Sequence, residues 1–320
     1  MSRPFAAEPV RIRVPATSAN LGPGFDSFGL ALGCHDEVTA RVTTRGLDVT
    51  IEGEGAGQVP LDEGHLVVRA MRRGFAAHGG QPPGLAVHCA NRIPHGRGLG
   101  SSAAAIVAGV VAARALSRVG DGDPPGHRFG GTETDLTLAA EIEGHPDNVA
   151  ACVLGGFTVA WTESVPDQAE GSTMRTSAIR LEPLPAIRPI ALVPGQQLAT
   201  EQARALLPPS VPHRDAAHTA ARAALLVHAL TARPDLLLSA TDDRLHQPYR
   251  APAMPDSRML LSALRQAGVP AAISGAGPTV LALAISKYTE LITAMATERG
   301  WSVYDCGLDR DGARGVRLGR

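Results

Sequence analysis

A run of alternating glycines in front of an Ala/Val-rich stretch constrains this chain more than any other feature. Residues 92–105 read RIPHGRGLGSSAAA, with Gly96, Gly98 and Gly100 two positions apart and a predicted helix beginning at Ser101. Glycines at this spacing let the backbone adopt positive φ and approach a bulky anion closely. The free N–H groups and the dipole at the start of the helix point at that anion. The pattern predicts a phosphate-binding loop, and the alternative is a turn that only joins a strand to a buried helix.

The chain contains one lysine, Lys287. This scarcity of lysine limits the kinds of phosphate site that the chain can form. Walker-A loops, protein kinases and pyridoxal enzymes each need a lysine inside their motif. A dinucleotide-binding loop also fits poorly, because its glycines follow G-x-G-x-x-G with an acidic residue ~20 positions later. We therefore expect backbone N–H groups, arginine or a metal ion to contact the phosphates.

The composition excludes several other classes of protein. The chain has 320 residues, 44% of them hydrophobic, which is enough for two domains with their own cores. Its net charge of −1 and its 3% aromatic content argue against a nucleic-acid-binding face. No apolar run approaches the ~20 residues that span a bilayer, and the N-terminus lacks the apolar core of a signal peptide. We expect a cytoplasmic protein without a membrane partner.

The four cysteines, Cys34, Cys89, Cys152 and Cys306, lie far apart in the sequence and include no C-x-x-C pair. This spacing suggests neither a zinc site nor a disulfide framework. We expect all four to be reduced core residues.

Periodicity predicts an α+β fold with helices on one face of a sheet. The polar segment Thr162–Ser177 is the predicted boundary between domains spanning residues 1–162 and 163–320. A loop is expected at Gly120–Gly131. The predicted strands are Val10–Val14, Ala40–Ile51, Val153–Trp161, Ile187–Val193, Ala271–Ser274 and Thr279–Ile285, with a last one ending near Cys306. The predicted helices are Leu66–Ala77, Ser101–Leu116, Thr134–Glu143, Thr200–Leu206, Asp215–Leu230 and Asp256–Ala267, with one more before the last strand.

Three motifs in order resemble those of the GHMP kinases, a family named for galacto-, homoserine, mevalonate and phosphomevalonate kinases. Pro94–Ala103 resembles the family signature P-x-x-x-G-L-G-S-S-A. Pro15–Asp26 is similar to the N-terminal motif of the homoserine branch, and Ile273–Thr279 to the C-terminal glycine loop. Further likeness to that branch lies in Glu143–Val149, Thr200–Arg204, Gln247–Arg250 and Leu308–Arg314. The resemblance covers nearly the whole chain.

This resemblance implies a two-domain GHMP kinase fold, with an N-terminal domain like domain 2 of ribosomal protein S5 and a ferredoxin-like C-terminal domain. It implies direct transfer of the ATP γ-phosphoryl group to the side-chain hydroxyl of L-homoserine, with Mg²⁺ as cofactor. The product would be O-phospho-L-homoserine, on the route to threonine. A homodimer is among the assemblies that the resemblance allows.

The resemblance also implies site residues. The ATP phosphates would contact Pro94, His95, Gly96, Arg97, Gly98, Leu99, Gly100, Ser101, Ser102, Ala103 and Ala104. Mg²⁺ would be held by Ser102 and Glu141, with Glu143 as the rival ligand. Homoserine would be bound by Asn20, Asp26, His145, Thr200, Arg250 and Gly275, with Asp147 and Arg204 as catalytic residues. Asp147 would orient the acceptor hydroxyl, with general-base catalysis as the alternative role.

Two positions depart from the family pattern. Many members have Asn-x-Val where they contact adenine, and this chain has His65-Leu-Val67. Arg97 stands where relatives more often have a small residue, so it either reaches a phosphate or faces water.

Other functions stay open at this point. The chain could be another small-molecule kinase of the family or a ligand-binding relative that has lost phosphoryl transfer. The presence of Ser101, Ser102, Glu141 and Asp147 argues against such a loss. An S5-like nucleic-acid binder is disfavoured by the charge and the low aromatic content.

Overall fold

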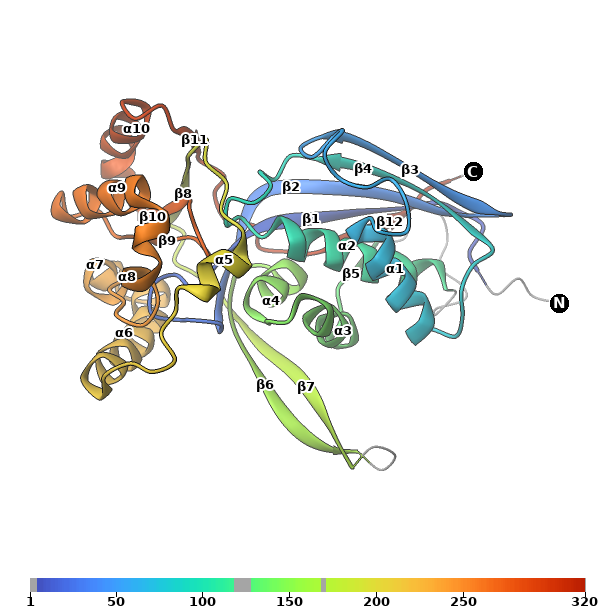
Figure 1. Ribbon diagram of the computed structural model, residues 1–320, viewed down its shortest axis with the longest axis horizontal. Helices are drawn as coiled ribbons and strands as arrows, with labels where there is room; N and C mark the ends of the chain where they lie inside the picture. The colour runs from blue at the N-terminus through green and yellow to red at the C-terminus, as the bar shows by residue number, and fades with distance from the viewer. Residues whose placement is uncertain (1–4, 118–127, 168–170, 320) are drawn as a thin grey trace.

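The structure is a computed structural model that describes residues 5–117, 128–167 and 171–319. Figure 1 shows two lobes, one built on a large sheet that comes mainly from the N-terminal part of the chain and the other on a smaller sheet from the second half. The pocket described below lies between them.

In the described part of the chain, the large sheet has eight strands. Its main path runs β3 (Gly46–Gly53), β4 (Gly84–Asn91), β2 (Phe28–Thr43), β1 (Val10–Ala19), β12 (Arg314–Arg317) and β5 (Arg128–Gly130). Strand β6 (Phe157–Asp167) pairs with β2 and with β7 (Gly171–Leu181).

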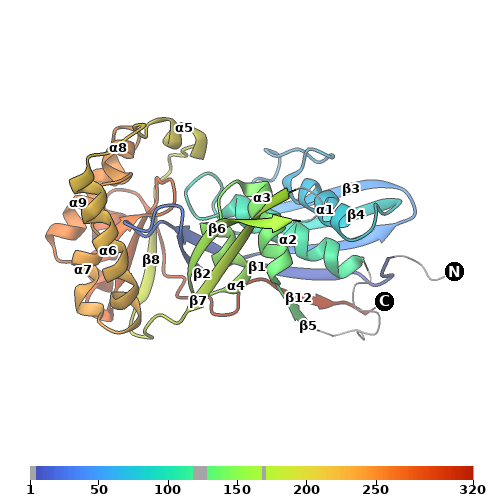
Figure 2. The ribbon, with the colours of Figure 1, turned by 90° about the horizontal axis from the view of Figure 1, so that it is seen from below.

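Alternation along β1 explains why helices cover one face of this sheet. Val10, Ile12 and Val14 are fully buried, whereas Arg11 and Arg13 between them are exposed. The buried face packs against the helices, as Figures 1 and 2 show. These are α1 (Leu66–Ala77), α2 (Ser101–Leu116), α3 (Glu133–Glu143) and α4 (Asp147–Leu154).

The smaller sheet has the strand order β11 (Ser302–Tyr304), β8 (Arg188–Val193), β10 (Val280–Ala284) and β9 (Ala271–Ile273), all antiparallel. Numbered along the chain, this order is 4-1-3-2, with helices after the first and third strands, so the expected ferredoxin-like arrangement is confirmed. Helices and turns of this half are α5 (Thr200–Ala205), α6 (His213–Thr231), η1 (Pro234–Leu236), α7 (Leu237–Ala240), α8 (Gln247–Arg250), η2 (Ala251–Ala253), α9 (Pro255–Gln266), η3 (Ser286–Tyr288) and α10 (Thr289–Thr297).

Unlike the prediction of helices on one face, this sheet contributes to two cores. Ile190 and Leu192 of β8 pack in the cluster that holds α9 and α10, whereas Ala191 and Val193 belong to the cluster that holds α6 and α7. Both faces of the smaller sheet are therefore buried.

Several predicted elements need correction. Ala40–Ile51 is not one strand, because a turn with Gly46 at φ 76° separates the end of β2 from β3. Val153–Trp161 begins in the last turn of α4, and β6 starts only at Phe157, after two glycines with positive φ. The predicted loop Gly120–Gly131 lies outside the described residues except for Arg128–Gly131, of which Arg128–Gly130 form strand β5 and not a loop. The bounds predicted for α1 and α2 are confirmed.

The predicted boundary segment is not a linker. Its described residues, 162–167 and 171–177, belong to the hairpin β6–β7, which Figure 1 shows extending away from the large sheet. Strand β12 also returns from the end of the chain to pair with β1. The domain limits 1–162 and 163–320 stay a prediction, with the last strand contributing to the first sheet.

Two further expectations concern the surface. Cys89 and Cys152 are buried as predicted, but Cys34 and Cys306 are half-buried, so the prediction of four core cysteines is wrong for this pair. Among the described residues, no helix combines the length and apolar character needed to cross a membrane.

Candidate active site

The predicted phosphate loop has the backbone that its glycines require. Gly96, Gly98 and Gly100 have φ of 65°, 74° and 69°. Helix α2 follows at once, and its first turn has neither a side-chain cap nor an acidic residue. The N–H groups at the start of α2 have no acceptors within the helix, so they are available to an anion.

Hydrogen bonds join the two glycine loops and the N-terminal motif, although these three segments lie far apart in the sequence. Ser274 Oγ donates a hydrogen bond to the carbonyl of Gly98 (2.6 Å). Gly275 N donates to the carbonyl of Ala19 (3.0 Å), and Asn20 Nδ2 donates to the carbonyl of Gly275 (2.9 Å). The three motifs therefore build one site.

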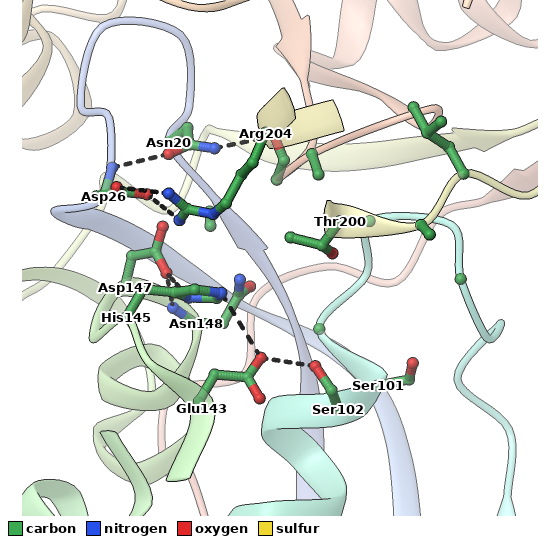
Figure 3. A pocket seen from close by; sticks show the side chains of 18 of the residues that line it. Asn20, Asp26, Ser101, Ser102, Glu143, His145, Asp147, Asn148, Thr200 and Arg204 are labelled. Carbon is green, nitrogen blue, oxygen red and sulfur yellow. Dashed lines mark hydrogen bonds and ion pairs between the residues drawn. The ribbon is translucent and has the colours of Figure 1, made fainter. Parts of the chain in front are cut away.

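A cavity of about 190 Å³ opens between these loops. It collects the predicted acceptor-site residues from five separate segments, together with the phosphate loop (Figure 3). The residues predicted to bind or act on the acceptor all line it: Asn20, Asp26, His145, Asp147, Thr200, Arg204, Arg250 and Gly275. Gly96, Gly98, Gly100, Ser101 and Ser102 line the same cavity.

Asp26 and Arg204 face each other across one side of this cavity. The two terminal nitrogens of the Arg204 guanidinium, Nη1 and Nη2, donate to the Asp26 carboxylate at 3.1 and 2.6 Å. This hydrogen bonding raises the pKa of Arg204. Asn20 and Asp26 have φ of 69° and 54°, and Asn20 Oδ1 accepts a hydrogen bond from Asp26 N. The amide of Asn20 thus fixes this strained loop at both ends and positions the Asp26 carboxylate.

Arg250 is a buried cation at the base of the cavity. It is only 1% exposed, and its Nε has no hydrogen-bond partner. Its neighbours are His246 Nδ1 at 3.3 Å, the carbonyl of Gly275 at 3.4 Å and the ring of Phe25, whose centroid lies 5.4 Å from the guanidinium carbon. Among the described residues no carboxylate forms an ion pair with Arg250, and burial lowers its pKa. Because a buried cation needs compensation, the arrangement is suited to an anionic ligand.

Ser102, Glu143 and His145 form a polar cluster where α2 meets the end of α3. Ser102 Oγ donates to Glu143 Oε1 (2.6 Å), and His145 Nε2 lies 4.0 Å from the same oxygen (Figure 3). Burial raises the pKa of Glu143 even though the Ser102 hydroxyl and the neighbouring His145 oppose this shift. A desolvated carboxylate beside a hydroxyl is a donor set that suits a hard cation such as Mg²⁺.

Asp147 is the first residue of α4 and is buried. Its Oδ1 accepts a hydrogen bond from Asn148 N (2.7 Å) and lies 3.0 Å from His145 Nδ1. This contact with Asp147 is the largest cause of a raised pKa at His145. Figure 3 shows the second carboxylate oxygen of Asp147 on the side of Arg204 and Asp26. Asp147 therefore presents an acceptor atom to the cavity.

The placement of Glu141 corrects one expected metal ligand. Its side chain is 47% exposed and lies 3.7 Å from Arg73, and it does not line the cavity with Ser102. The Glu143 side chain is 9% exposed and bonds Ser102. Positions two apart on a helix point to nearly opposite sides, so only one of these glutamates faces the phosphate loop.

The other predicted phosphate-loop residues have different environments. His95 and Ala104 line a second cavity of about 260 Å³, which also contains Ser101 and Ser102. Arg97 is half-buried and does not line the cavity. It donates to the carbonyls of Pro194 and Gly195, at 3.0 and 3.2 Å, and ties the loop to the end of β8. Pro94, Leu99 and Ala103 are buried.

His65, which departs from the family pattern, lines the second cavity. His65 caps the start of α1 and is 6% exposed, and its Nδ1 has no hydrogen-bond partner. Burial lowers the pKa of His65, so its neutral form is favoured. A neutral imidazole offers one donor and one acceptor to a ligand.

Some residues of the site were missed from the sequence. Asn148 Oδ1 accepts a hydrogen bond from Thr17 Oγ1 (2.8 Å), and the two side chains lie against Gly100. The guanidinium carbons of Arg204 and Arg250 lie 5.8 and 5.4 Å from the centroid of the Phe25 ring. Both Asn148 and Phe25 stand inside motifs already singled out, which was the signal that could have found them.

Comparison with known proteins places this geometry in a family. Residues 65–156 match the model of the GHMP kinases N-terminal domain, and residues 221–296 match that of the GHMP kinases C-terminal domain. A curated homoserine kinase of Streptomyces avermitilis is 58% identical over 309 residues, which cover 97% of this chain and 96% of that protein. One from Rhodococcus opacus is 50% identical and covers 96% of each chain.

A solved structure shows the same architecture. The crystal structure of homoserine kinase from Cytophaga hutchinsonii superposes with a TM-score of 0.80 at 25% identity, covering 99% of this chain and all of that one. The expected two-domain GHMP kinase fold is confirmed. Fold, site and relatives agree, and the chain belongs to the GHMP kinase family, within its homoserine kinases.

Proposed function

We propose that this protein transfers the γ-phosphoryl group of ATP to the side-chain hydroxyl of L-homoserine, giving O-phospho-L-homoserine for threonine biosynthesis. The observation that carries the choice of acceptor is Arg250, a buried guanidinium that forms no direct ion pair with a carboxylate of the described residues. An α-carboxylate in the cavity would supply the missing negative charge, and guanidinium binds carboxylates in a planar, two-pronged geometry.

The ammonium group of the acceptor is matched by Asp26. Asp26 already bonds the cation of Arg204, so its carboxylate is positioned for a positive group. A ligand with a carboxylate at Arg250 and an ammonium group at Asp26 has the head of an amino acid. Its hydroxyl then extends toward Asp147, on the side of the cavity where the phosphate loop lies. These oppositely charged ends favour homoserine over mevalonate or a sugar.

The nucleotide is assigned to the two connected cavities. Its phosphates would lie against the N–H groups that follow Gly100, and its base would enter the second cavity beside His65. Family membership implies the use of ATP, and the absence of lysine from the lining of both cavities fits a site built on backbone donors.

The residues present also fit Mg²⁺. Ser102 and Glu143 would hold it, because both offer hard oxygen atoms and the buried Glu143 carboxylate is short of positive charge. Mg²⁺ usually has one or two protein ligands when phosphate oxygens and water complete its coordination shell. Among the described residues, no group of three or more His, Cys, Asp or Glu side chains could hold a metal ion. When bound, Mg²⁺ would neutralise charge on the phosphates.

Positioning accounts for most of the chemistry that the chain itself provides. Asp147 would accept a hydrogen bond from the acceptor hydroxyl and aim its oxygen at the γ-phosphorus, while Arg204 would stabilise charge near the transferred group. In a loose transition state the hydroxyl proton leaves late, so a strong base is not required. We therefore propose orientation as the role of Asp147, with general-base catalysis as the lesser alternative.

The decisive test is an acceptor screen. Purified protein with Mg²⁺ and ATP should form ADP only when an acceptor is supplied, with L-homoserine preferred over serine, threonine and mevalonate. Equal turnover of mevalonate or a sugar would refute the acceptor, and binding of homoserine without ADP formation would favour a ligand-binding relative. We also propose a cytoplasmic location and a homodimer, which fractionation and sedimentation would test.

A further inference from the structure

Two cysteines that are far apart in the sequence lie opposite each other beside the base of the phosphate loop. Leu32 of β2 and Leu308, in the connection between β11 and β12, form an antiparallel bridge. Gly33 N donates to the carbonyl of Gly307 (3.1 Å), and Cys34 and Cys306 are the chain neighbours of these two residues. The two cysteine side chains lie close enough to interact with each other. A disulfide requires Cα atoms ~4.4–6.8 Å apart.

The environment of this pair promotes thiol chemistry. A hydrogen bond from the Cys306 side chain is the largest cause of the lowered pKa of Cys34, and Arg92 lowers it further. The same contact raises the pKa of Cys306. Burial and the Asp36 carboxylate oppose the shift at Cys34 without cancelling it. Cys34 is thus the thiol that forms thiolate more readily, and both sulfurs belong to half-buried residues that a small reagent can reach.

The remaining two cysteines provide an internal contrast. Cys89 and Cys152 are fully buried. Burial raises the pKa of Cys89 to about 12 and that of Cys152 well above its ordinary value. Neither is suited to react, so only one pair in the chain combines proximity, access and a stabilised thiolate.

We propose that Cys34 and Cys306 form a reversible disulfide that joins β2 to the β11–β12 connection. The co-reactant is a low-molecular-weight disulfide. The Cys34 thiolate attacks one of its sulfurs and releases one thiolate, which leaves a mixed disulfide on Cys34. Cys306 then loses its proton and attacks Cys34 Sγ, releasing the second thiolate. Two protein thiols are oxidised and one small disulfide is reduced to two thiols.

The position of Cys34 links this modification to nucleotide binding. Its thiol donates to the carbonyl of Arg92 at 3.7 Å, a weak contact at the start of the phosphate-loop segment. Asp36, two residues along the same strand, accepts hydrogen bonds from Arg92 N (2.6 Å) and Ile93 N (2.9 Å) and lines the second cavity. Oxidation removes the Cys34 donor and fixes its sulfur to Cys306. We expect KM for ATP to rise about 2–10-fold, the usual effect of one lost hydrogen bond, with KM for homoserine unchanged.

Titration of the full-length protein with mixtures of oxidised and reduced glutathione tests the proposal. The number of thiols that are alkylated after denaturation should fall from four to two, and peptide mapping should identify a Cys34–Cys306 link that dithiothreitol reverses. Cys34→Ser and Cys306→Ser should each abolish the link, and Cys306→Ser should instead retain a glutathione adduct on Cys34. Cys89→Ala is the matched control and should form the link as the wild type does.

The thiol count and the peptide map do not depend on the phosphoryl acceptor. The disulfide proposal can therefore be refuted independently of the proposed function. Retention of four free thiols across the titration would overturn the proposal, as would a disulfide that involves Cys89 or Cys152. A Cys34–Cys306 disulfide that leaves KM for ATP unchanged would contradict its connection to the phosphate loop.

Discussion

The two ends of the active site are built in different ways. The phosphate end consists of backbone from one continuous segment, Gly96–Ser102, whose shape depends on glycines and on the start of α2. The acceptor end consists of side chains such as Asp26, Asp147 and Arg250, which come from distant parts of the chain. Substitutions at the first end should therefore act through backbone shape, and those at the second through the loss of one charge or hydrogen bond.

Gly98→Ala should have the largest effect on stability and activity, because it changes the backbone of the phosphate end of the site. Its φ of 74° disfavours alanine, and the new Cβ would lie 2.3 Å from the carbonyl oxygen of Ser274. Gly46→Ala is the matched control, with φ of 76° and open space around the Cβ. We expect Gly46→Ala to lower the free energy of unfolding by about 1–2 kcal/mol, and Gly98→Ala to lower it by more and to abolish most activity.

Denaturant unfolding and steady-state kinetics check this pair. Equal losses in the two variants would mean that close contact between the two glycine loops contributes nothing beyond the backbone strain.

Asp147 is the sharpest test of the side-chain end. Asp147→Ala removes the atom that would orient the hydroxyl and should reduce turnover about 10²-fold. Asp147→Asn keeps an acceptor in its amide oxygen and should retain more turnover than the Ala variant. Similar, severe losses in both variants, with homoserine binding intact by calorimetry, would instead identify Asp147 as a general base.

The two glutamates of α3 provide a control within one helix. Glu143→Gln removes the charge beside Ser102 and should raise the Mg²⁺ concentration needed for half-maximal activity by about 10-fold or more. Glu141→Gln changes an exposed residue that faces Arg73 and should leave the Mg²⁺ dependence unaltered. Activity measured against Mg²⁺ concentration checks both, and the reverse ranking would restore Glu141 as the ligand.

Arg97 should give the smallest effect. Because its guanidinium bonds the carbonyls of Pro194 and Gly195, Arg97→Ala loosens the phosphate loop without removing a phosphate contact. We expect KM for ATP to rise about 2–10-fold, with KM for homoserine nearly unchanged. A loss of turnover as large as that of Asp147→Ala would show that Arg97 acts on the transferred group.

The contrast between the two ends also explains what the sequence could predict. The bounds of α2 and the positive φ of its preceding glycines follow from local pattern, so they were predictable. The family resemblance implied Glu141 as the metal ligand, with Glu143 as the rival on the same predicted helix. Only the packing of α3 against α2 decides which of the two faces Ser102. Cys34 and Cys306 become neighbours only through the return of the chain to the large sheet. Contacts between distant segments are where the local pattern carried no information.

The central claim is that Arg250 binds the carboxylate of the acceptor. It is tested most directly by a double cycle that combines one change in the protein with one change in the substrate. One change is Arg250→Met, and the other replaces homoserine by the amino alcohol that remains when its carboxyl group is removed. The specificity constant kcat/KM is measured for all four combinations, with thermal unfolding as a check that the variant folds. In the wild type, loss of the carboxylate should reduce kcat/KM about 10²-fold, and in Arg250→Met it should cost little. Thermal stability should be retained or increased, because a buried charge that forms no direct ion pair is removed. A folded Arg250→Met variant that still prefers homoserine over the amino alcohol as strongly as the wild type does would contradict the claim.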